Sequence, residues 1–272
     1  MREYLERVRA TAPLIHNITN YVTVNDCANI LLACGGSPIM SDDGGEVEEI
    51  TSICAGLNIN IGTLNRHTVP SMFLAGKKAN LCGHPVLLDP VGAGASVLRT
   101  ETAAKLLAEL SVSVVRGNIS EIKALAGAGS AARGVDADAV DAVTEENLDQ
   151  AAALVRAFAA ENHTVAAVSG AIDLVSDGKK TYVIRNGHPI MSRITGSGCM
   201  LSAMTAAYIA ANPGHIAEAA AASFCAMGLC GEIAWQRMKP EDGNSSFRNY
   251  LIDAVYRLDG EILEKGAKYE IR

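Results

Sequence analysis

The sequence predicts an α/β fold in which a largely parallel sheet carries helices on both faces. Short, almost continuously apolar runs bounded by Gly, Pro or Asn alternate with segments of helical periodicity. Such runs are typical of strands that are buried on both faces of a sheet. The alternation of strand and helix favours parallel connections between neighbouring strands.

Most of the predicted strands are separated by predicted helices. The strands are expected at residues 37–40, 57–61, 85–88, 112–115, 165–168, 174–176 and 181–184. The helices of this part are expected at residues 22–33, 47–54, 69–80, 100–110, 120–126 and 145–160. This order predicts that most strand ends carrying polar residues share one edge of the sheet.

The final third of the chain is predicted to be helical, with no further strand after residue 184. Helices are expected at 198–211, 215–238 and 247–264, and apolar residues repeat every three or four positions in the last one. Gly228 and Gly231 in the middle helix indicate close contact with another helix. No linker divides the chain, so we expect one domain over residues 1–272, with 127–142 as a mobile loop.

Composition excludes several classes of protein. Of the 272 residues, 49% are hydrophobic and 19% are charged, whereas about 25% are charged in typical soluble domains. A disordered chain is therefore excluded. The formal net charge of −7 and the lack of a Lys/Arg run argue against a nucleic-acid partner. The longest uncharged stretch, 194–217, is interrupted by glycines and Pro213, so we expect no membrane span.

The termini and cysteines favour a cytoplasmic protein. The first ten residues are charged and lack the apolar core of a signal peptide. The seven cysteines are an odd number and form no C-x-x-C pair. Neither a disulfide framework nor a structural zinc site is therefore expected.

The common signatures of nucleotide enzymes and hydrolases are absent. The sequence has no G-x-x-x-x-G-K-[ST] loop, no complete G-x-G-x-x-G, no H-R-D or D-F-G, and no G-x-S-x-G or H-E-x-x-H. A nucleotide would have to be bound by another arrangement.

The most informative segment is a glycine-spaced turn that opens directly into a predicted helix. It contains Gly196, Ser197, Gly198 and Cys199. Unpaired backbone N–H groups and the helix dipole at such a point attract a phosphate or a developing phosphoryl charge. Cys199 would lie in the first turn, where the pKa of a thiol tends to fall, so it is a candidate general base. The alternative is an ordinary glycine-rich helix start with a buried thiol.

Two further segments follow apolar strands. Asp89 stands at a strand end, where α/β sheets bind ligands, or else it caps the next turn. Asn118 and Glu121 lie three residues apart across a helix start, with Ser120 as a candidate N-cap. One carboxylate and one amide suit a hydrated Mg²⁺, which prefers oxygen ligands. A purely capping arrangement is the alternative.

Weaker signals come from Ser169, at another strand end, and from the polar residues of segment 14–26. Asn17, Asn20 and Asn25 are candidates for orienting a small polar ligand, although turn and cap chemistry uses the same residues. Met40 is a candidate pocket wall, although a lone Met is more often a core residue. Acidic groups and an anion-binding turn at one sheet edge, without a nucleophile triad, indicate metal-assisted phosphoryl transfer.

At this point the sequence resembles the hydroxyethylthiazole kinases of thiamine salvage, which belong to the ribokinase-like superfamily. The resemblance covers most of the chain. It is carried by His16-Asn17-Ile18-Thr19-Asn20 with Asn25, Pro38-Ile39-Met40, 57–64, 89–93, Arg116-Gly117-Asn118 with Glu121, Ser169-Gly170 and 195–199. The N-x-x-E pair and the glycine turn belong to the whole superfamily, whereas the H-N-I-T-N and D-P-V-G-A segments are typical of the thiazole branch.

The resemblance implies a three-layer α/β/α ribokinase-like sandwich and a reaction. The enzyme would transfer the γ-phosphoryl group of ATP to the hydroxyl of 4-methyl-5-(2-hydroxyethyl)thiazole. Asp89 and Glu121 would organise Mg²⁺ and the phosphates. Arg116, Ser169 and Asn118 would contact ATP, and Met40, Gly196 and Asn25 the thiazole. The backbone of Gly196, Ser197 and Gly198 would stabilise the phosphoryl group in transfer.

Cys199 departs from the superfamily pattern, in which an Asp usually occupies this position as the base. A similar Cys occurs in some thiazole kinases, and it leaves the identity of the base open. The family also implies a homotrimer with active sites between subunits, in which Asn25 reaches a thiazole bound by the adjacent chain. The alternatives are a hydroxymethylpyrimidine kinase, an ATP-dependent dehydratase of hydrated NADH and NADPH, and a thiazole-binding protein without catalysis.

Overall fold

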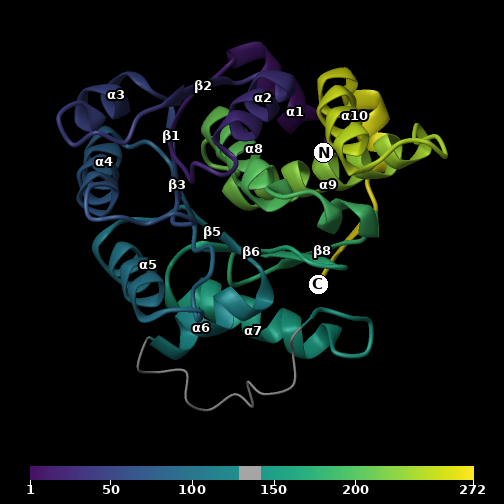
Figure 1. Cartoon of the computed structure of the whole chain (residues 1–272). Helices are drawn as coiled ribbons and strands as arrows, with labels where there is room; N and C mark the ends of the chain where they lie inside the picture. The colour runs from purple at the N-terminus through teal and green to yellow at the C-terminus, as the bar shows by residue number, and fades with distance from the viewer. Residues whose placement is uncertain (129–141) are drawn as a thin grey trace.

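A central sheet organises the chain in the computed structural model, which describes residues 1–128 and 142–272. The described strands form one nine-stranded sheet in the order β2-β1-β3-β4-β5-β6-β7-β8-β9. Pairing is parallel from β2 through to β6 and antiparallel from β6 to β9. The largely parallel sheet is therefore confirmed (Figure 1). Apart from its ends, the predicted loop 127–142 lies outside the described residues.

The predicted strands all form within two residues of their expected bounds. The strands are β1 Leu14–Ile18, β2 Ser37–Met40, β3 Gly56–Asn60, β4 Val86–Asp89, β5 Val114–Gly117, β6 Val165–Val168, β7 Asp173–Ser176, β8 Thr181–Ile184 and β9 Tyr269–Ile271. The helices are α1 Arg2–Thr11, α2 Val24–Cys34, α3 Val47–Ile53, α4 Thr68–Cys82, α5 Val97–Glu109, α6 Ile119–Ala128, α7 Leu148–Glu161, the short 3-10 helix η2 Pro189–Arg193, α8 Ser197–Ala211, α9 Ile216–Gln236, α10 Asn244–Arg257 and α11 Gly260–Gly266.

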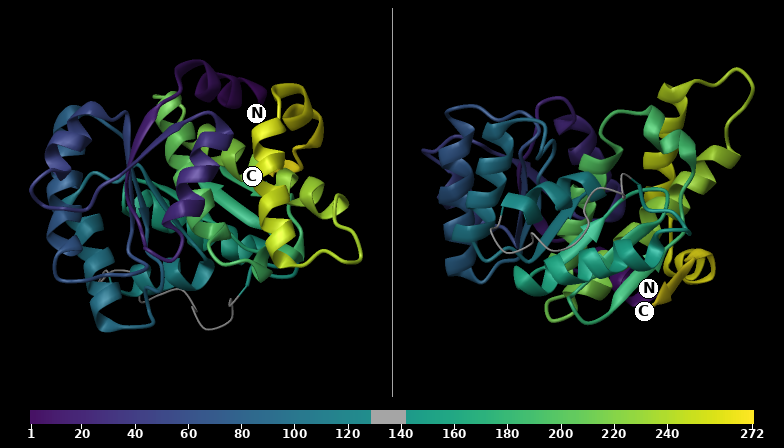
Figure 2. Two further views of the ribbon diagram at one scale, coloured as in Figure 1. Left: turned by 45° about the horizontal axis from the view of Figure 1, so that its top comes forward. Right: turned by 90° about the horizontal axis from the view of Figure 1, so that it is seen from below.

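Helices cover both faces of the sheet and give the expected three layers (Figures 1 and 2). Helices α4, α6 and α7 pack on one face, and α8 and α9 pack on the other. Each face has its own apolar core, one containing Leu57, Val115 and Phe158, the other Met204, Tyr208 and Phe224. Helix α9 is long and apolar enough to cross a membrane, but 78% of its most apolar window is buried inside the fold. Helix α9 is therefore buried as a core helix of the fold.

Strand β1 was not predicted, because its polar residues suggest turn or cap chemistry. His16 and Asn17 are nevertheless buried on β1, which pairs with β2 on one side and β3 on the other. His16 reaches Thr51 Oγ1 through Nδ1 and the Ser41 carbonyl through Nε2, each at 2.9 Å. Asn58 on β3 donates to Asn17 Oδ1 at 2.9 Å. Hydrogen bonds inside the fold thus replace those with water, which makes a polar strand stable in the core.

The C-terminal region corrects two further predictions. Strand β9 pairs with β8, so the expectation of no strand after residue 184 is wrong; it is short and exposed, and gives little apolar signal. The predicted helix 247–264 is two helices. Leu258 is extended, and the Asp259 side chain accepts from Ile262 N at 2.7 Å, which starts α11.

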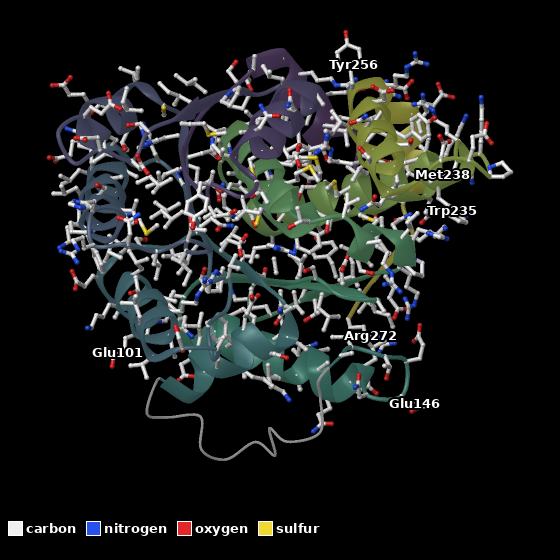
Figure 3. All side chains as sticks on the ribbon, in the orientation of Figure 1. Glu101, Glu146, Trp235, Met238, Tyr256 and Arg272 are labelled. Atoms are coloured by element: carbon white, nitrogen blue, oxygen red, sulfur yellow. The ribbon has the colours of Figure 1, made fainter. Side chains whose placement is uncertain are left out.

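Two glycines of α9 face the segment that follows β8. A Cβ at Gly228 would lie 2.7 Å from the Asn186 backbone, and one at Gly231 would lie 2.4 Å from Met191 Sδ. The helix–helix contact predicted for this helix is confirmed, since α9 packs against α8 and α10, but Gly228 and Gly231 themselves admit the segment that follows β8. Trp235, nearer the end of α9, points outward (Figure 3) and stacks on His188 with ring centroids 4.4 Å apart.

Candidate active site

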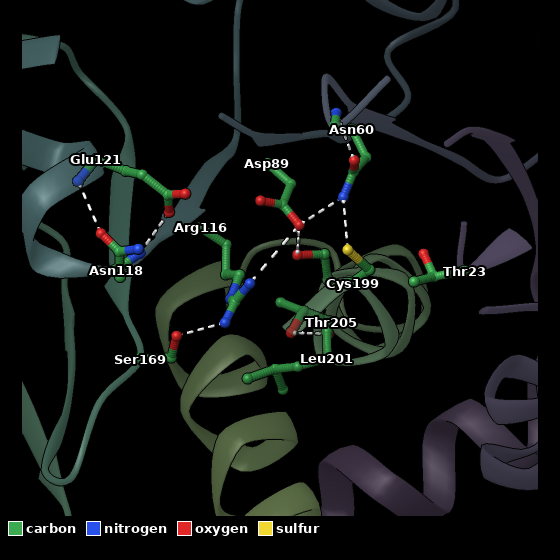
Figure 4. A network of polar contacts seen from close by, with 12 residues as sticks. Thr23, Asn60, Asp89, Arg116, Asn118, Glu121, Ser169, Cys199, Leu201 and Thr205 are labelled. Carbon is green, nitrogen blue, oxygen red and sulfur yellow. Dashed lines mark hydrogen bonds and ion pairs between the residues drawn. The ribbon is translucent and has the colours of Figure 1, made fainter. Parts of the chain in front are cut away.

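Polar side chains from three parallel strands meet at the carboxyl edge of the sheet. Asp89 ends β4, Arg116 lies near the end of β5, and Ser169 follows β6. Because these strands are parallel neighbours, their ends lie side by side. Helix α8 begins at the same edge, as Figure 4 shows. Of the residues expected to converge on one cleft, Asp89, Ser169 and the glycine turn therefore lie at this edge, and Asn118 and Glu121 lie at the start of α6, directly after β5.

Arg116 joins Asp89 to Ser169. Its Nη1 lies 3.6 Å from Asp89 Oδ2, and its Nη2 donates to Ser169 Oγ. Asp89 Oδ2 also accepts from Ser202 Oγ at 2.7 Å and from Asn60 Nδ2 at 2.8 Å. Asp89 is fully buried, and this burial raises its pKa to about 6 even though Arg116 acts in the opposite direction.

Two atoms of this junction are buried without a hydrogen-bond partner among the described residues. They are Asp89 Oδ1 and Arg116 Nε. Buried polar atoms are nearly always paired in folded proteins, so orphaned atoms on a carboxylate and a guanidinium point to a ligand or water at this place. A bound charged group with its water would supply partners for both atoms.

The glycine turn lies directly beside Arg116. Gly196 has a φ of +82°, and a Cβ there would lie 2.4 Å from Thr23 Cγ2. A Cβ at Gly198 would lie 2.7 Å from Arg116 Nη1. The first helical hydrogen bond runs from Met200 N to the Gly196 carbonyl. Gly196 is the N-cap and has no side chain, so it cannot cap the backbone N–H groups that precede Met200 in the helix. The turn therefore exposes the start of α8 next to a guanidinium, an arrangement that attracts anions.

Cys199 lies in the first turn of α8, as predicted, and is partly exposed. Its sulfur accepts from Asn20 Nδ2 at 3.2 Å and from Asn60 Nδ2 at 3.3 Å. Burial, and then the Asp89 carboxylate, raise the pKa of the thiol above its ordinary value, although hydrogen bonds from Thr23, Asn60 and Asn20 oppose the shift. The expected lowering by the helix start is therefore not found, because desolvation is the larger effect.

Asn118 and Glu121 form a reciprocal cap at the start of α6. Glu121 N donates to Asn118 Oδ1, and Asn118 N donates to Glu121 Oε2, both at 2.8 Å. Glu121 Oε1 accepts from Gly92 N at 2.8 Å. Asn118, rather than the predicted Ser120, thus takes the N-cap role. No group of three or more metal-ligating side chains occurs in residues 1–128 and 142–272.

Met40 and Asn25 lie outside this junction. Met40 ends β2, half-buried against the apolar core that contains α8. Asn25 is exposed on α2, where its side-chain oxygen accepts from Asn29 Nδ2 at 3.0 Å. No contact links either residue to Asp89 or Cys199 among the interactions of the described residues. Their predicted roles toward a thiazole remain predictions.

A cavity of about 480 Å³ opens beside the junction. Arg116, Ser169, Ser197 and Gly198 line its polar end, and the remaining wall includes Asp173, His188, Phe224 and Met227. The sequence did not point to the second set, which comes from β7, the segment after β8, and α9. Asn60 was also not proposed as a site residue, although its place at the end of an apolar strand was a usable signal.

The comparisons with known proteins decide the family. The family model described as "Hydroxyethylthiazole kinase family" matches residues 5–261. The chain belongs to this family. It is 62% identical over 270 residues to the hydroxyethylthiazole kinase of Clostridium acetobutylicum, with 99% of each chain covered. A solved hydroxyethylthiazole kinase from Pyrococcus horikoshii OT3 is 37% identical, with a TM-score of 0.88 and coverage of 100% and 98%.

A more distant solved structure supports the fold of this hydroxyethylthiazole kinase family member. A ribokinase-like superfamily protein from Enterococcus faecalis V583 has a TM-score of 0.61 at 11% identity, with 94% of each chain covered. At this identity the likeness concerns the fold alone. The predicted ribokinase-like sandwich is confirmed.

Proposed function

We propose that the chain transfers the γ-phosphoryl group of ATP to the hydroxyl of 4-methyl-5-(2-hydroxyethyl)thiazole. The observation that carries this proposal is the junction of Asp89, Arg116 and Ser169 beside the open start of α8. A carboxylate, a guanidinium and backbone N–H groups meet there at the end of a cavity. Phosphoryl transfer depends mainly on such alignment and charge stabilisation.

In the proposed reaction the substrate hydroxyl oxygen forms a bond to the γ-phosphorus. The bond between that phosphorus and the β–γ bridging oxygen breaks, and ADP leaves with the electron pair. Arg116 and Ser169 hold the phosphates, with Asn118 at the ATP side, while the backbone of Gly196, Ser197 and Gly198 stabilises the charge of the phosphoryl group. Burial raises the pKa of the Cys199 thiol, so the side chain keeps its proton and does not act as the base. The hydroxyl proton therefore leaves with the phosphoryl group.

The acidic residues fit a Mg²⁺ ion carried by ATP. Asp89 Oδ1 is buried and unpartnered among the described residues, so it is available to a cation or its water. Both oxygens of Glu121 accept backbone N–H bonds, but each retains a second lone pair. Mg²⁺ is commonly held by one or two carboxylates together with substrate phosphates. Bound there by Asp89 and Glu121, it would neutralise phosphate charge.

No hydrogen bond within the described part of the chain joins the residues proposed for the thiazole end to one another. Gly196 lies at the junction, whereas Asn25 is exposed on α2 and Met40 ends an edge strand. A homotrimer with sites between subunits would combine them, and sedimentation of the purified chain measures the assembly. A cytoplasmic location and a single domain over 1–272 complete the proposal; one sheet shared by strands from Leu14 to Ile271 supports the latter.

A product assay tests this function directly. With ATP, Mg²⁺ and hydroxyethylthiazole, we expect thiazole phosphate and ADP to appear one for one, and chelation of Mg²⁺ to stop both. Hydroxymethylpyrimidine replaces the thiazole as the control acceptor and should give little product. ADP without thiazole phosphate, in the presence of hydrated NADH, would support the dehydratase alternative. Binding without turnover would support the non-catalytic one.

Substitution of Cys199 tests whether a base limits the rate. Because the transition state is loose and the thiol is protonated, Cys199→Ala should retain substantial turnover, within about tenfold of the unchanged chain. Cys199→Asp should retain or raise it. Steady-state rates of thiazole phosphate formation measure both. Complete loss of turnover in a folded, ATP-binding alanine variant would contradict the view that alignment dominates.

A further inference from the structure

Two asparagines outside the predicted catalytic set hold the sulfur of Cys199. Asn20 follows β1 and Asn60 ends β3, and both are buried, with 5% and 1% of their surface exposed. Their Nδ2 atoms lie 3.2 and 3.3 Å from Cys199 Sγ. Cys199 itself is only partly buried. Two buried amides thus hold a residue that itself remains partly exposed.

The hydrogen bonds of both amides are fully assigned, which fixes their orientation. Asn60 Oδ1 accepts from Asn20 Nδ2 at 3.0 Å and from Gly62 N at 2.9 Å. Asn20 Oδ1 accepts from Thr23 N at 3.1 Å and from Thr23 Oγ1 at 3.0 Å. A flip of either amide would set its Nδ2 against a backbone N–H, that of Thr23 for Asn20 and that of Gly62 for Asn60, where two donors would face each other. Each nitrogen must therefore face Cys199.

A third polar group, the Thr23 hydroxyl, also hydrogen-bonds to the sulfur. Thr23 Oγ1 donates its proton to Asn20 Oδ1 at 3.0 Å, so Asn20 holds both the sulfur and the hydroxyl beside it. Together with Asn60, these groups fix the place of a sulfur that is still partly exposed.

We propose that Asn20 and Asn60 are positioning residues that hold the partly exposed sulfur of Cys199 where it meets the substrate hydroxyl. This inference rests on the proposed function and deepens it. The hydroxyl oxygen, in contact with the sulfur, uses a lone pair to form the bond to the γ-phosphorus. The bond to the β–γ bridging oxygen breaks, ADP leaves with that electron pair, and the hydroxyl proton departs with the phosphoryl group.

Asn20 is the better residue to test, because Asn60 also donates to Asp89. The test is a double-mutant cycle of Asn20→Leu with Cys199→Ala, measured as kcat and as KM for hydroxyethylthiazole. With Cys199 present, we expect Asn20→Leu to lower kcat by about the same factor as Cys199→Ala does, up to about tenfold, and to change KM less than about twofold. With Cys199→Ala, the same substitution should change kcat less than about twofold, since no sulfur remains to be positioned.

Asn58→Leu is the matched control. Asn58 lies two residues before Asn60 on β3 and is equally buried, but it donates to Asn17 rather than to Cys199. It should change kcat less than about twofold. Should Asn20→Leu fail to fold, Asn20→Asp replaces it in the cycle. This variant keeps an oxygen acceptor for Thr23 and removes the two N–H donors.

The outcomes separate this inference from the proposed function. If the unchanged chain forms no thiazole phosphate, the proposed function is wrong and the inference fails with it. If the unchanged chain is active but Asn20→Leu lowers kcat by the same factor in both backgrounds, only the positioning role is overturned. An equal loss of kcat in Asn58→Leu would also overturn the positioning role. Such a result would mean that replacing any buried asparagine of this region lowers kcat.

Discussion

Gly198→Val is expected to lower kcat at least about a thousandfold while leaving the chain folded. A Cβ at this position would lie 2.7 Å from Arg116 Nη1 and 3.0 Å from Nη2. The guanidinium is the end of a long side chain, so it can move aside without disrupting the core. Moving it separates Arg116 from Asp89 and Ser169, and the valine also covers the N–H groups at the start of α8.

Gly243→Val is the control for this substitution. Gly243 also precedes a helix, α10, but a Cβ there meets no described atom within 4 Å. It should keep the rate of thiazole phosphate formation within about twofold. Thermal unfolding of both variants shows whether they are folded. A folded Gly198→Val that keeps more than about a tenth of the turnover would remove the anion-binding role of the turn.

Asp89→Asn is the second substitution with a large expected effect. The amide cannot carry the negative charge that Arg116 and the proposed Mg²⁺ require, so kcat should fall about a hundredfold or more. The same steady-state assay measures the loss. Asp253→Asn, which removes the carboxylate of an exposed pair with Arg237, should not change it.

The stability of Asp89→Asn should move in the opposite direction from its activity. Burial raises the pKa of Asp89 to about 6 from an ordinary value of 3.8. The folded state therefore binds this proton more tightly than the unfolded state, and its stability falls as pH rises from about 4 to about 6. Above that window the ionised carboxylate destabilises the fold, and Asn removes the charge.

Denaturant unfolding at several pH values checks this effect. The variant should have a larger free energy of unfolding than the unchanged chain at pH 8, and the difference should shrink below about pH 4, where Asp89 is protonated in both states. A variant that is less stable at pH 8 would mean that the ion pair with Arg116 outweighs the cost of burying the charge.

The parallel half of the fold was predictable because its strands are apolar on both faces. β3, β4, β5 and β6 have this pattern, and each was expected within two residues of its place. Strand β1 was not, since His16 and Asn17 are satisfied by partners distant in sequence, such as Ser41 and Asn58. Such pairing is invisible in a local pattern.

The candidate site likewise has a part that local sequence signals predict and a part that they do not. The location of Asp89, Arg116, Ser169 and the turn before α8 follows from strand ends and a glycine pattern, both of which are local. The hydrogen bonds of Asn20 and Asn60 to Cys199 join residues 179 and 139 positions apart. The direction of the Cys199 pKa shift was wrong because the helix start is visible in sequence, whereas the burial that outweighs it is not.

The antiparallel strands carry an exposed turn on the side of the sheet away from the candidate active site. β6 ends at the site edge, and since β7 runs back, its turn into β8 lies at the opposite edge. The tip of that turn, Lys179, is exposed. Exposed loop tips accept insertions. A reporter domain or a surface anchor placed there would leave the catalytic edge of the sheet free, a practical route to immobilising this enzyme.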